Sequence, residues 1–143
     1  MTRASWKDID KRAAAIWLFL IAAATGCQEP VGLVSGTVTF EGQPLPAGDV
    51  LFSPEDASVV PAYGTLDEAG HYHLTRAKNK PGAVPAKYRV TVQIDARENS
   101  DVARKYSIPA VYSDPSKTPL QVEVQQGENR YDIDLSRSAI IDH

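Results

Sequence analysis

The sequence predicts an all-β protein, an antiparallel β-sandwich of about seven strands. Three observations support this prediction: apolar and polar residues alternate in several short segments, turns rich in glycine and proline separate these segments, and no segment after Pro30 shows the apolar repeat of a helix. With 143 residues, 43% hydrophobic and 23% charged, the chain has the composition of one globular domain with an N-terminal extension.

The segments 32–40 and 49–54 are the first two expected strands. Side chains alternate between the two faces of a strand, so every second residue shares a face. The predicted core-facing residues are Val34, Gly36, Val38 and Phe40 in the first strand, and Val50 and Phe52 in the second.

The segment 63–75, YGTLDEAGHYHLT, is expected to form a β-hairpin. The turn is supplied by Asp67–Gly70, in which the glycine permits a positive φ. Beyond the turn, Tyr72 and Leu74 are expected to face the core.

The clearest strand of the chain is 87–95, KYRVTVQID. A second hairpin is expected over 120–135, LQVEVQQGENRYDIDL, with its turn at 127–129. The core-facing residues predicted for these segments are Tyr88, Val90, Val92 and Ile94, then Leu120, Val122 and Val124, then Tyr131, Ile133 and Leu135.

Two segments interrupt this strand pattern. Residues 76–86, RAKNKPGAVPA, form a basic loop rich in turn residues, and residues 96–119 form a longer excursion containing three prolines. Excursions of this length in compact domains are often functional. Within it, 98–106 is expected to form one or two helical turns.

The N-terminal segment has the layout of a secretory signal. A basic stretch ending at Lys11-Arg12 precedes an apolar run over 13–24 and then small residues. The run has 12 residues, whereas a helix that crosses a bilayer needs about 20. An uncleaved membrane anchor is therefore the weakest of three interpretations.

The other two interpretations differ in where the signal is cleaved. Cleavage after the alanines at 22–24 releases a soluble secreted protein with a free thiol. The alternative depends on the segment 24–27, Ala-Thr-Gly-Cys, which resembles the lipoprotein box of bacteria. That resemblance implies that Cys27 becomes the first mature residue and carries a diacylglycerol. The chain's only cysteine lies where this lipidation requires one.

The favoured organisation follows from the lipoprotein interpretation. It has a signal peptide at 1–26, a lipid-anchored linker at 27–32, the sandwich at 33–136 and a tail at 137–143. The family resemblance also implies a localisation. Gln28, rather than an aspartate, follows the cysteine, and this favours the outer membrane of the cell envelope over the inner membrane.

The order of motifs in the domain resembles the carboxypeptidase regulatory-like, or transthyretin-like, β-sandwich. More closely, 34–135 is similar to short lipoproteins of planctomycetes built on that domain. The family patterns match Gly36, Val38, Gly42, Pro44 and Gly48, then Asp67, Gly70, Tyr72 and Leu74, then Pro109, Tyr112, Asp114 and Pro115. The resemblance implies a module for display or interaction, with no particular ligand.

A metal site is the sharpest local alternative. His71 and His73 share one face of a strand, and together they can ligate Zn²⁺ or Cu²⁺ if a third ligand lies nearby. Asp132 and Asp134, on one face of the final strand, are candidates for that ligand. The alternative interpretation is a pair of solvent-facing histidines beside a turn.

Other chemistry finds less support in the sequence. We identify no catalytic residue and expect neither an enzyme nor a cofactor besides the lipid, because no serine or cysteine stands in a recognisable nucleophile motif. The body of the chain is acidic, since residues 1–26 hold four of the 15 basic side chains and two of the 18 acidic ones; this argues against nucleic-acid binding.

Binding of a glycan would use exposed aromatic rings. Trp6 and Trp17 lie in the predicted signal peptide, which leaves two tyrosines of the excursion. The candidate partner-binding loop comprises Tyr106, Pro109, Tyr112, Asp114 and Pro115. The competing interpretation is that the tyrosines fix this loop to the sandwich.

The sequence thus predicts a non-enzymatic envelope lipoprotein that displays a β-sandwich to a protein or glycan partner. A metal-binding accessory lipoprotein using His71 and His73, and a soluble secreted carbohydrate-binding module, are the alternatives.

Overall fold

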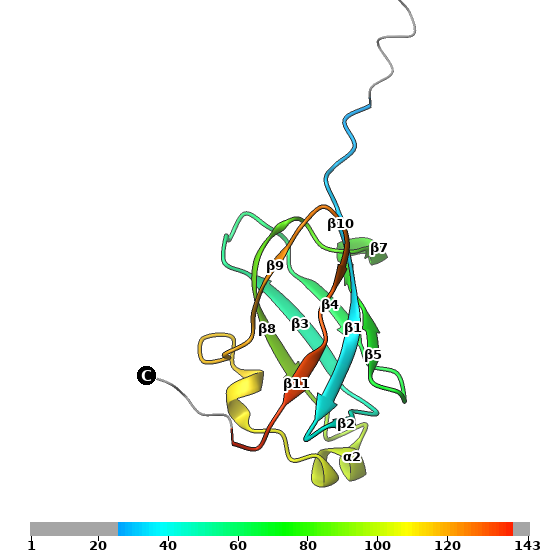
Figure 1. Cartoon of the computed structure of the whole chain (residues 1–143), viewed down its shortest axis with the longest axis vertical. Coiled ribbons are helices and arrows are strands. Elements are labelled where there is room, and N and C mark those ends of the chain that lie inside the picture. The colour runs from blue at the N-terminus through cyan, green and yellow to red at the C-terminus, as the bar shows by residue number, and fades with distance from the viewer. Residues whose placement is uncertain (1–25, 139–143) are drawn as a thin grey trace, which may run out of the picture.

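The computed structural model describes residues 26–138 (Figure 1). Two sheets pack face to face, with little helix, and this arrangement confirms the predicted all-β sandwich. All but one residue of the predicted signal peptide, and the last five residues of the predicted tail, lie outside the described residues.

The smaller sheet is built around one long strand, β1 (Gly32–Phe40). On one side β1 pairs antiparallel with β2 (Gln43–Pro44) and β5 (His71–His73). On the other side it pairs with β10 (Gly127–Arg130) and β11 (Ile133–Leu135), and both of these pairings are parallel. These two parallel pairings are exceptions within the otherwise antiparallel sandwich that the sequence predicted.

The larger sheet is antiparallel throughout and has the order β7-β6-β4-β3-β8-β9. Its strands are β3 (Asp49–Pro54), β4 (Ala62–Thr65), β6 (Thr75–Arg76), β7 (Lys80–Pro81), β8 (Ala86–Gln93) and β9 (Gln121–Val124). The described residues thus contain more strand segments than the seven expected, and three of them, β2, β6 and β7, are only two residues long.

Short helical elements occupy the two predicted interruptions. The basic loop contains the 3-10 turn η1 (Ala77–Asn79), and the excursion contains helix α2 (Ser100–Lys105) and the 3-10 turn η2 (Ala110–Ser113). The expected helical turn in the excursion is confirmed.

The core lies between the sheets and contains most of the predicted inward residues. Val34, Val38 and Phe40 of β1 meet Val50 and Phe52 of β3 across the interface. Tyr72, Leu74, Tyr88, Val90, Val92, Val124, Ile133 and Leu135 are also buried, as predicted. Four of the predicted inward residues, Ile94, Leu120, Val122 and Tyr131, are only partly buried.

The first predicted hairpin forms its turn, but its strands pair only at the end away from the turn, where Tyr63 lies in register with Thr75. At the turn Gly70 has a φ of +79° and donates its N–H to the Asp67 carbonyl at 2.9 Å. The segment after the turn then divides at Leu74, because β5 pairs with β1 of the smaller sheet and β6 pairs with β4 of the larger sheet. This one segment therefore joins the two sheets.

The second predicted hairpin is wrong. Residues 127–129 belong to strand β10 beside β1, and the chain crosses from the larger to the smaller sheet just before them. The Asn129 side chain stabilises this crossing: its amide oxygen accepts the Gln125 N–H at 3.0 Å, and its amide nitrogen donates to the Gln125 carbonyl at 2.7 Å. The connection after β9 therefore joins the two sheets, and 127–129 is not the turn of a hairpin.

Gly36 permits a close backbone contact in the centre of the smaller sheet. A Cβ atom at this position would lie 1.8 Å from the Tyr131 carbonyl oxygen, at the break between β10 and β11. The same oxygen accepts a hydrogen bond from the buried Tyr72 hydroxyl at 2.6 Å. The absent side chain at Gly36 therefore lets the C-terminal strand pair lie against β1.

Candidate functional site

Residues 26–31, which we call the tether, lead into β1 and leave the sandwich at one end (Figure 1). The thiol of Cys27 is exposed and forms no disulfide bond. The tether becomes fixed at Gly32, whose N–H and carbonyl both hydrogen bond to Ala83 at 2.8 Å. Cys27 therefore lies outside the folded domain, where an attached group would not disturb the core.

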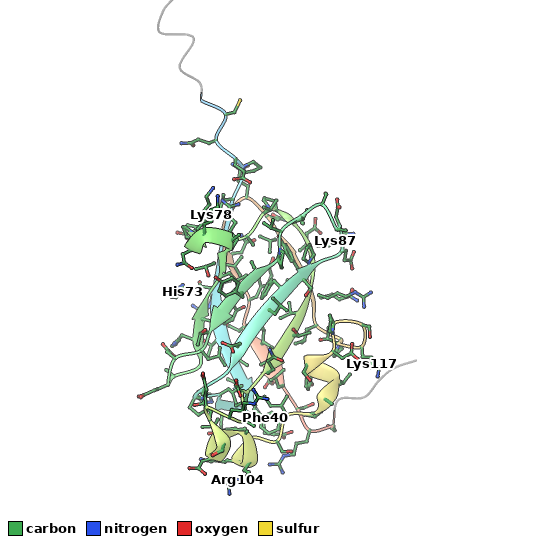
Figure 2. All side chains as sticks on the ribbon, turned by 180° about the vertical axis from the view of Figure 1, so that it is seen from behind. Phe40, His73, Lys78, Lys87, Arg104 and Lys117 are labelled. Atoms are coloured by element: carbon green, nitrogen blue, oxygen red, sulfur yellow. The ribbon has the colours of Figure 1, made fainter. Side chains whose placement is uncertain are left out.

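His71 and His73 are both exposed on strand β5, as the sequence predicted. Figure 2 labels His73. They lie in register with Thr37 and Ser35 of β1, so the imidazoles share the outer face of the smaller sheet. The two histidines are two positions apart on one strand, which separates their backbones by roughly 7 Å.

The carboxylates proposed to complete a metal site already have partners. Asp132 accepts the Thr37 N–H at 3.0 Å through Oδ1 and the Arg130 Nε–H at 3.3 Å through Oδ2. The hydrogen bond from Thr37, then that from Arg130, lowers the pKa of Asp132. Asp134 accepts the Thr39 hydroxyl at 2.9 Å.

These contacts engage the two carboxylates proposed as the third ligand. Within residues 26–138, no group of three or more histidine, cysteine, aspartate or glutamate side chains is arranged to hold a metal ion. The arrangement therefore fits two solvated histidines beside a polar ladder better than a metal centre.

A groove of about 640 Å³ crosses the outer face of the smaller sheet, toward the end where the tether leaves. Its floor is formed by Leu33 and Ser35 of β1, and its walls include His73 on one side and Arg130 on the other. Leu33 is 48% exposed and gives this floor an apolar contact. The groove therefore combines an apolar floor with polar walls, as binding surfaces do.

The excursion packs onto the opposite end of the sandwich through its tyrosines. Tyr106 meets Phe40 edge to face, with ring centroids 6.3 Å apart. Tyr112 is buried, and its hydroxyl accepts the Ser136 N–H at 3.3 Å. Both rings therefore fix the loop to the domain, as the competing interpretation held, and Tyr112 has no free face for a partner.

The remaining residues of the candidate partner-binding loop form tight turns. Pro109 precedes η2, and Asp114 accepts hydrogen bonds from the Ser116 hydroxyl and N–H at 2.6 and 2.8 Å, which lower the pKa of Asp114. Pro115 is exposed. These contacts give Asp114 a local structural role.

Two noteworthy residues were not predicted from the sequence. Tyr63 on β4 is 45% exposed and lies in register with Leu51 and Thr75 on the outer face of the larger sheet. Alternation within AYGT could have revealed it. Arg76 on β6 is buried, although its segment was interpreted as a basic loop. Nothing in the sequence distinguishes it from the exposed lysines that follow.

No helix in the described part of the chain is both long enough and apolar enough to cross a membrane. The fold and the exposed tether thus define a small β-sandwich carrying an N-terminal segment with one free thiol.

Comparison with known proteins adds little to this description. No protein-family model matches the chain. No curated protein is similar enough to count as a relative. Among solved structures, a DUF3823 family protein from Parabacteroides merdae ATCC 43184 has a TM-score of 0.42 and 15% sequence identity. The match covers 76% of this chain and 47% of that one, so this chain spans about half of that protein's length.

Proposed function

We propose that this protein is a lipoprotein of the bacterial cell envelope, anchored through acylated Cys27 and without enzymatic activity. The observation that carries the proposal is the position of the chain's only cysteine, exposed on the tether before β1 begins at Gly32. The preceding segment, with its basic and apolar stretches, is the proposed signal peptide and lies outside the described residues.

Acylation at this position would give a firm anchor. Each buried methylene contributes about 0.8 kcal/mol, and two or more acyl chains hold a protein stably at a bilayer where one chain holds it only marginally. A thiol left unmodified on the surface would be open to oxidation. The residue after the cysteine, Gln28, favours localisation to the outer membrane.

The sandwich is the part that this anchor displays. We infer that it belongs with the transthyretin-like and carboxypeptidase regulatory-like domains of bacterial lipoproteins, on the motifs around Gly36, Gly70 and Tyr72. In the fold these residues make a close contact, a turn and a buried hydrogen bond. Such roles support a rigid module that binds through its surface.

The groove beside β1 is the surface best suited to a protein or glycan partner in the envelope. Its exposed Leu33 offers an apolar contact, and Ser35, His73 and Arg130 offer hydrogen bonds around it. It lies on the outer face of the smaller sheet, away from the excursion, whose tyrosines are engaged with the domain.

The anchor is tested by the intact mass of the membrane-extracted protein and by Cys27→Ser. We expect a mature chain that begins at Cys27 and carries acyl groups, and we expect Cys27→Ser to leave the membrane fraction. A mature chain that begins at Thr25 without lipid would contradict the proposal, and so would a serine variant that still fractionates with membranes.

The partner surface is tested by crosslinking in intact cells. We expect Arg130→Ala to reduce recovery of an envelope partner, while Arg104→Ala on α2, near the far end of the molecule, leaves it unchanged (Figure 2). Equal recovery with both variants would move the partner surface elsewhere.

A further inference from the structure

Arg76 is a buried cation whose side chain is only 9% exposed. It lies on β6 in register with Ala62 of β4, which is also buried. Its Nε and Nη1 atoms are fully buried and have no hydrogen-bond partner among residues 26–138. A guanidinium stays charged at any physiological pH, so it requires a compensating anion.

Glu29 of the tether supplies that anion. Its Oε2 lies 3.6 Å from Nη2 of Arg76, and no other ion pair of Arg76 occurs within the described residues. Charge-assisted hydrogen bonds of this type are about 2.8 Å long, so a shift of about 0.8 Å would complete one. The carboxylate of Glu29 is 61% exposed and has room to make this movement.

The surroundings of Arg76 increase its need for Glu29. Lys80, its register partner on β7, carries the same charge. The buried Tyr88 packs nearby but uses its hydroxyl as a donor to the Val84 carbonyl at 2.7 Å. Neither neighbour therefore compensates the charge on Arg76.

The backbone of the tether is restricted on the C-terminal side of Glu29. Pro30 follows it, and a residue before proline is restricted to extended backbone. The carbonyl of Val31 accepts the Gly127 N–H at 3.1 Å, which fixes the tether one residue beyond the proline. Glu29 therefore extends from an immobilised point over the end of the sandwich that also carries Lys78 and Lys87 (Figure 2).

We propose that Glu29 and Arg76 form a clamp that binds the tether to the sandwich and sets how the domain stands on its anchor. Without the clamp, residues 27–30 can span at most about 14 Å; with it, only Cys27 and Gln28 remain free, about 7 Å. The consequence for orientation depends on the proposed acylation of Cys27, whereas the clamp itself does not. The tether end of the sandwich then faces the membrane, and the excursion faces away from it.

The test uses a nitroxide label on Cys27, the only cysteine, in the unacylated full chain. The electron paramagnetic resonance spectrum should contain a slow-motion component in the wild type, and both Glu29→Gln and Arg76→Met should lose it. Glu128→Gln, an exposed acid at the same end of the sandwich, is the matched control and should retain it. A wild-type spectrum as mobile as that of Glu29→Gln would overturn the clamp.

Thermal unfolding provides a second readout on the same chains. Glu29→Gln should lower Tm by roughly 4 °C because it leaves Arg76 without an anion, and adding Arg76→Met to this variant should recover the loss. Inorganic phosphate provides a contrary outcome. Suppose that phosphate raises the Tm of the wild type and of Glu29→Gln but not that of Arg76→Met. The guanidinium would then bind an external anion, and the proposed clamp would be wrong. Because the chains are unacylated, these results do not depend on the lipid anchor.

Discussion

The two sheets of the sandwich are held together in different ways. The larger sheet is antiparallel, and β3 and β8 pair along six residues from Asp49 to Pro54. In the smaller sheet four short strands pair with β1, and three of them, β5, β10 and β11, come from distant parts of the chain. The first sheet depends on regular alternation, and the second depends on a few specific contacts at β1.

The contacts of the smaller sheet converge on one oxygen atom. The Tyr131 carbonyl lies over Gly36 and accepts the hydroxyl of Tyr72, so β1, β5 and the β10–β11 segment meet there. In the larger sheet the corresponding tyrosine, Tyr88, donates to the carbonyl of a loop residue, Val84. A single change should therefore disrupt the smaller sheet more than the larger one.

Gly36→Ala is the strongest test of this difference. The new Cβ would lie 1.8 Å from a backbone oxygen that cannot move without breaking the β10–β11 segment away from β1. We expect the free energy of unfolding to fall by about 4 kcal/mol or more, as measured by denaturant unfolding of the purified chain.

Two other glycines calibrate the effect of Gly36→Ala. Gly64→Ala in the larger sheet places a Cβ 2.7 Å from the His73 carbonyl oxygen and should cost less. Gly26→Ala, tested in the uncleaved and unacylated chain, meets nothing within 4 Å and should change stability by less than about 0.5 kcal/mol. If all three variants were equally stable, the close contact at Gly36 would have no importance for the fold.

Tyr72→Phe removes the hydroxyl that joins β5 to Tyr131. The buried carbonyl of Tyr131 loses this donor, so we expect a loss of about 1–3 kcal/mol in unfolding experiments at neutral pH. Tyr88→Phe is the matched change in the larger sheet.

The titration of Tyr72 predicts that the folded protein loses stability at alkaline pH. Burial, then the negative charge of Asp132, raises the pKa of Tyr72 above its usual value of 10.0. Above pH 10 the unfolded chain releases the Tyr72 proton more readily than the folded chain does. The contribution of Tyr72 to the free energy of unfolding is therefore complete below pH 10 and decreases as the pH rises above it. Tyr72→Phe should flatten this decrease, and an unchanged pH profile in the variant would contradict the assignment.

Alternation in the sequence predicted the two longest strands of the larger sheet, β3 and β8, well. Val50, Phe52, Tyr88, Val90 and Val92 are all buried, because a period of two fixes which face of a strand meets the core. The period does not identify the neighbouring strand. The parallel pairing of β1 with the C-terminal strands and the division of one segment at Leu74 were therefore missed.

Some features of the candidate sites could likewise be predicted from the sequence, and others could not. Exposure of His71 and His73 follows from alternation, and Cys27 is a candidate site because of its position beside the apolar run. The burial of Arg76 could not be predicted, because arginine is rarely buried and its strand is two residues long within a basic loop. Its partner, Glu29, comes from the linker, where no pairing was expected.

We expect the smallest effect on stability from the double variant His71→Ala/His73→Ala, on the outer face of the smaller sheet. Both side chains are exposed, and the nearby carboxylate of Asp132 already accepts hydrogen bonds at both of its oxygens. We expect the double variant to unfold within about 0.5 kcal/mol of the wild type. Elemental analysis should give the same metal content for both proteins. Zinc or copper bound at one equivalent in the wild type, and absent from the variant, would show that Asp132 exchanges these hydrogen bonds for a metal ion.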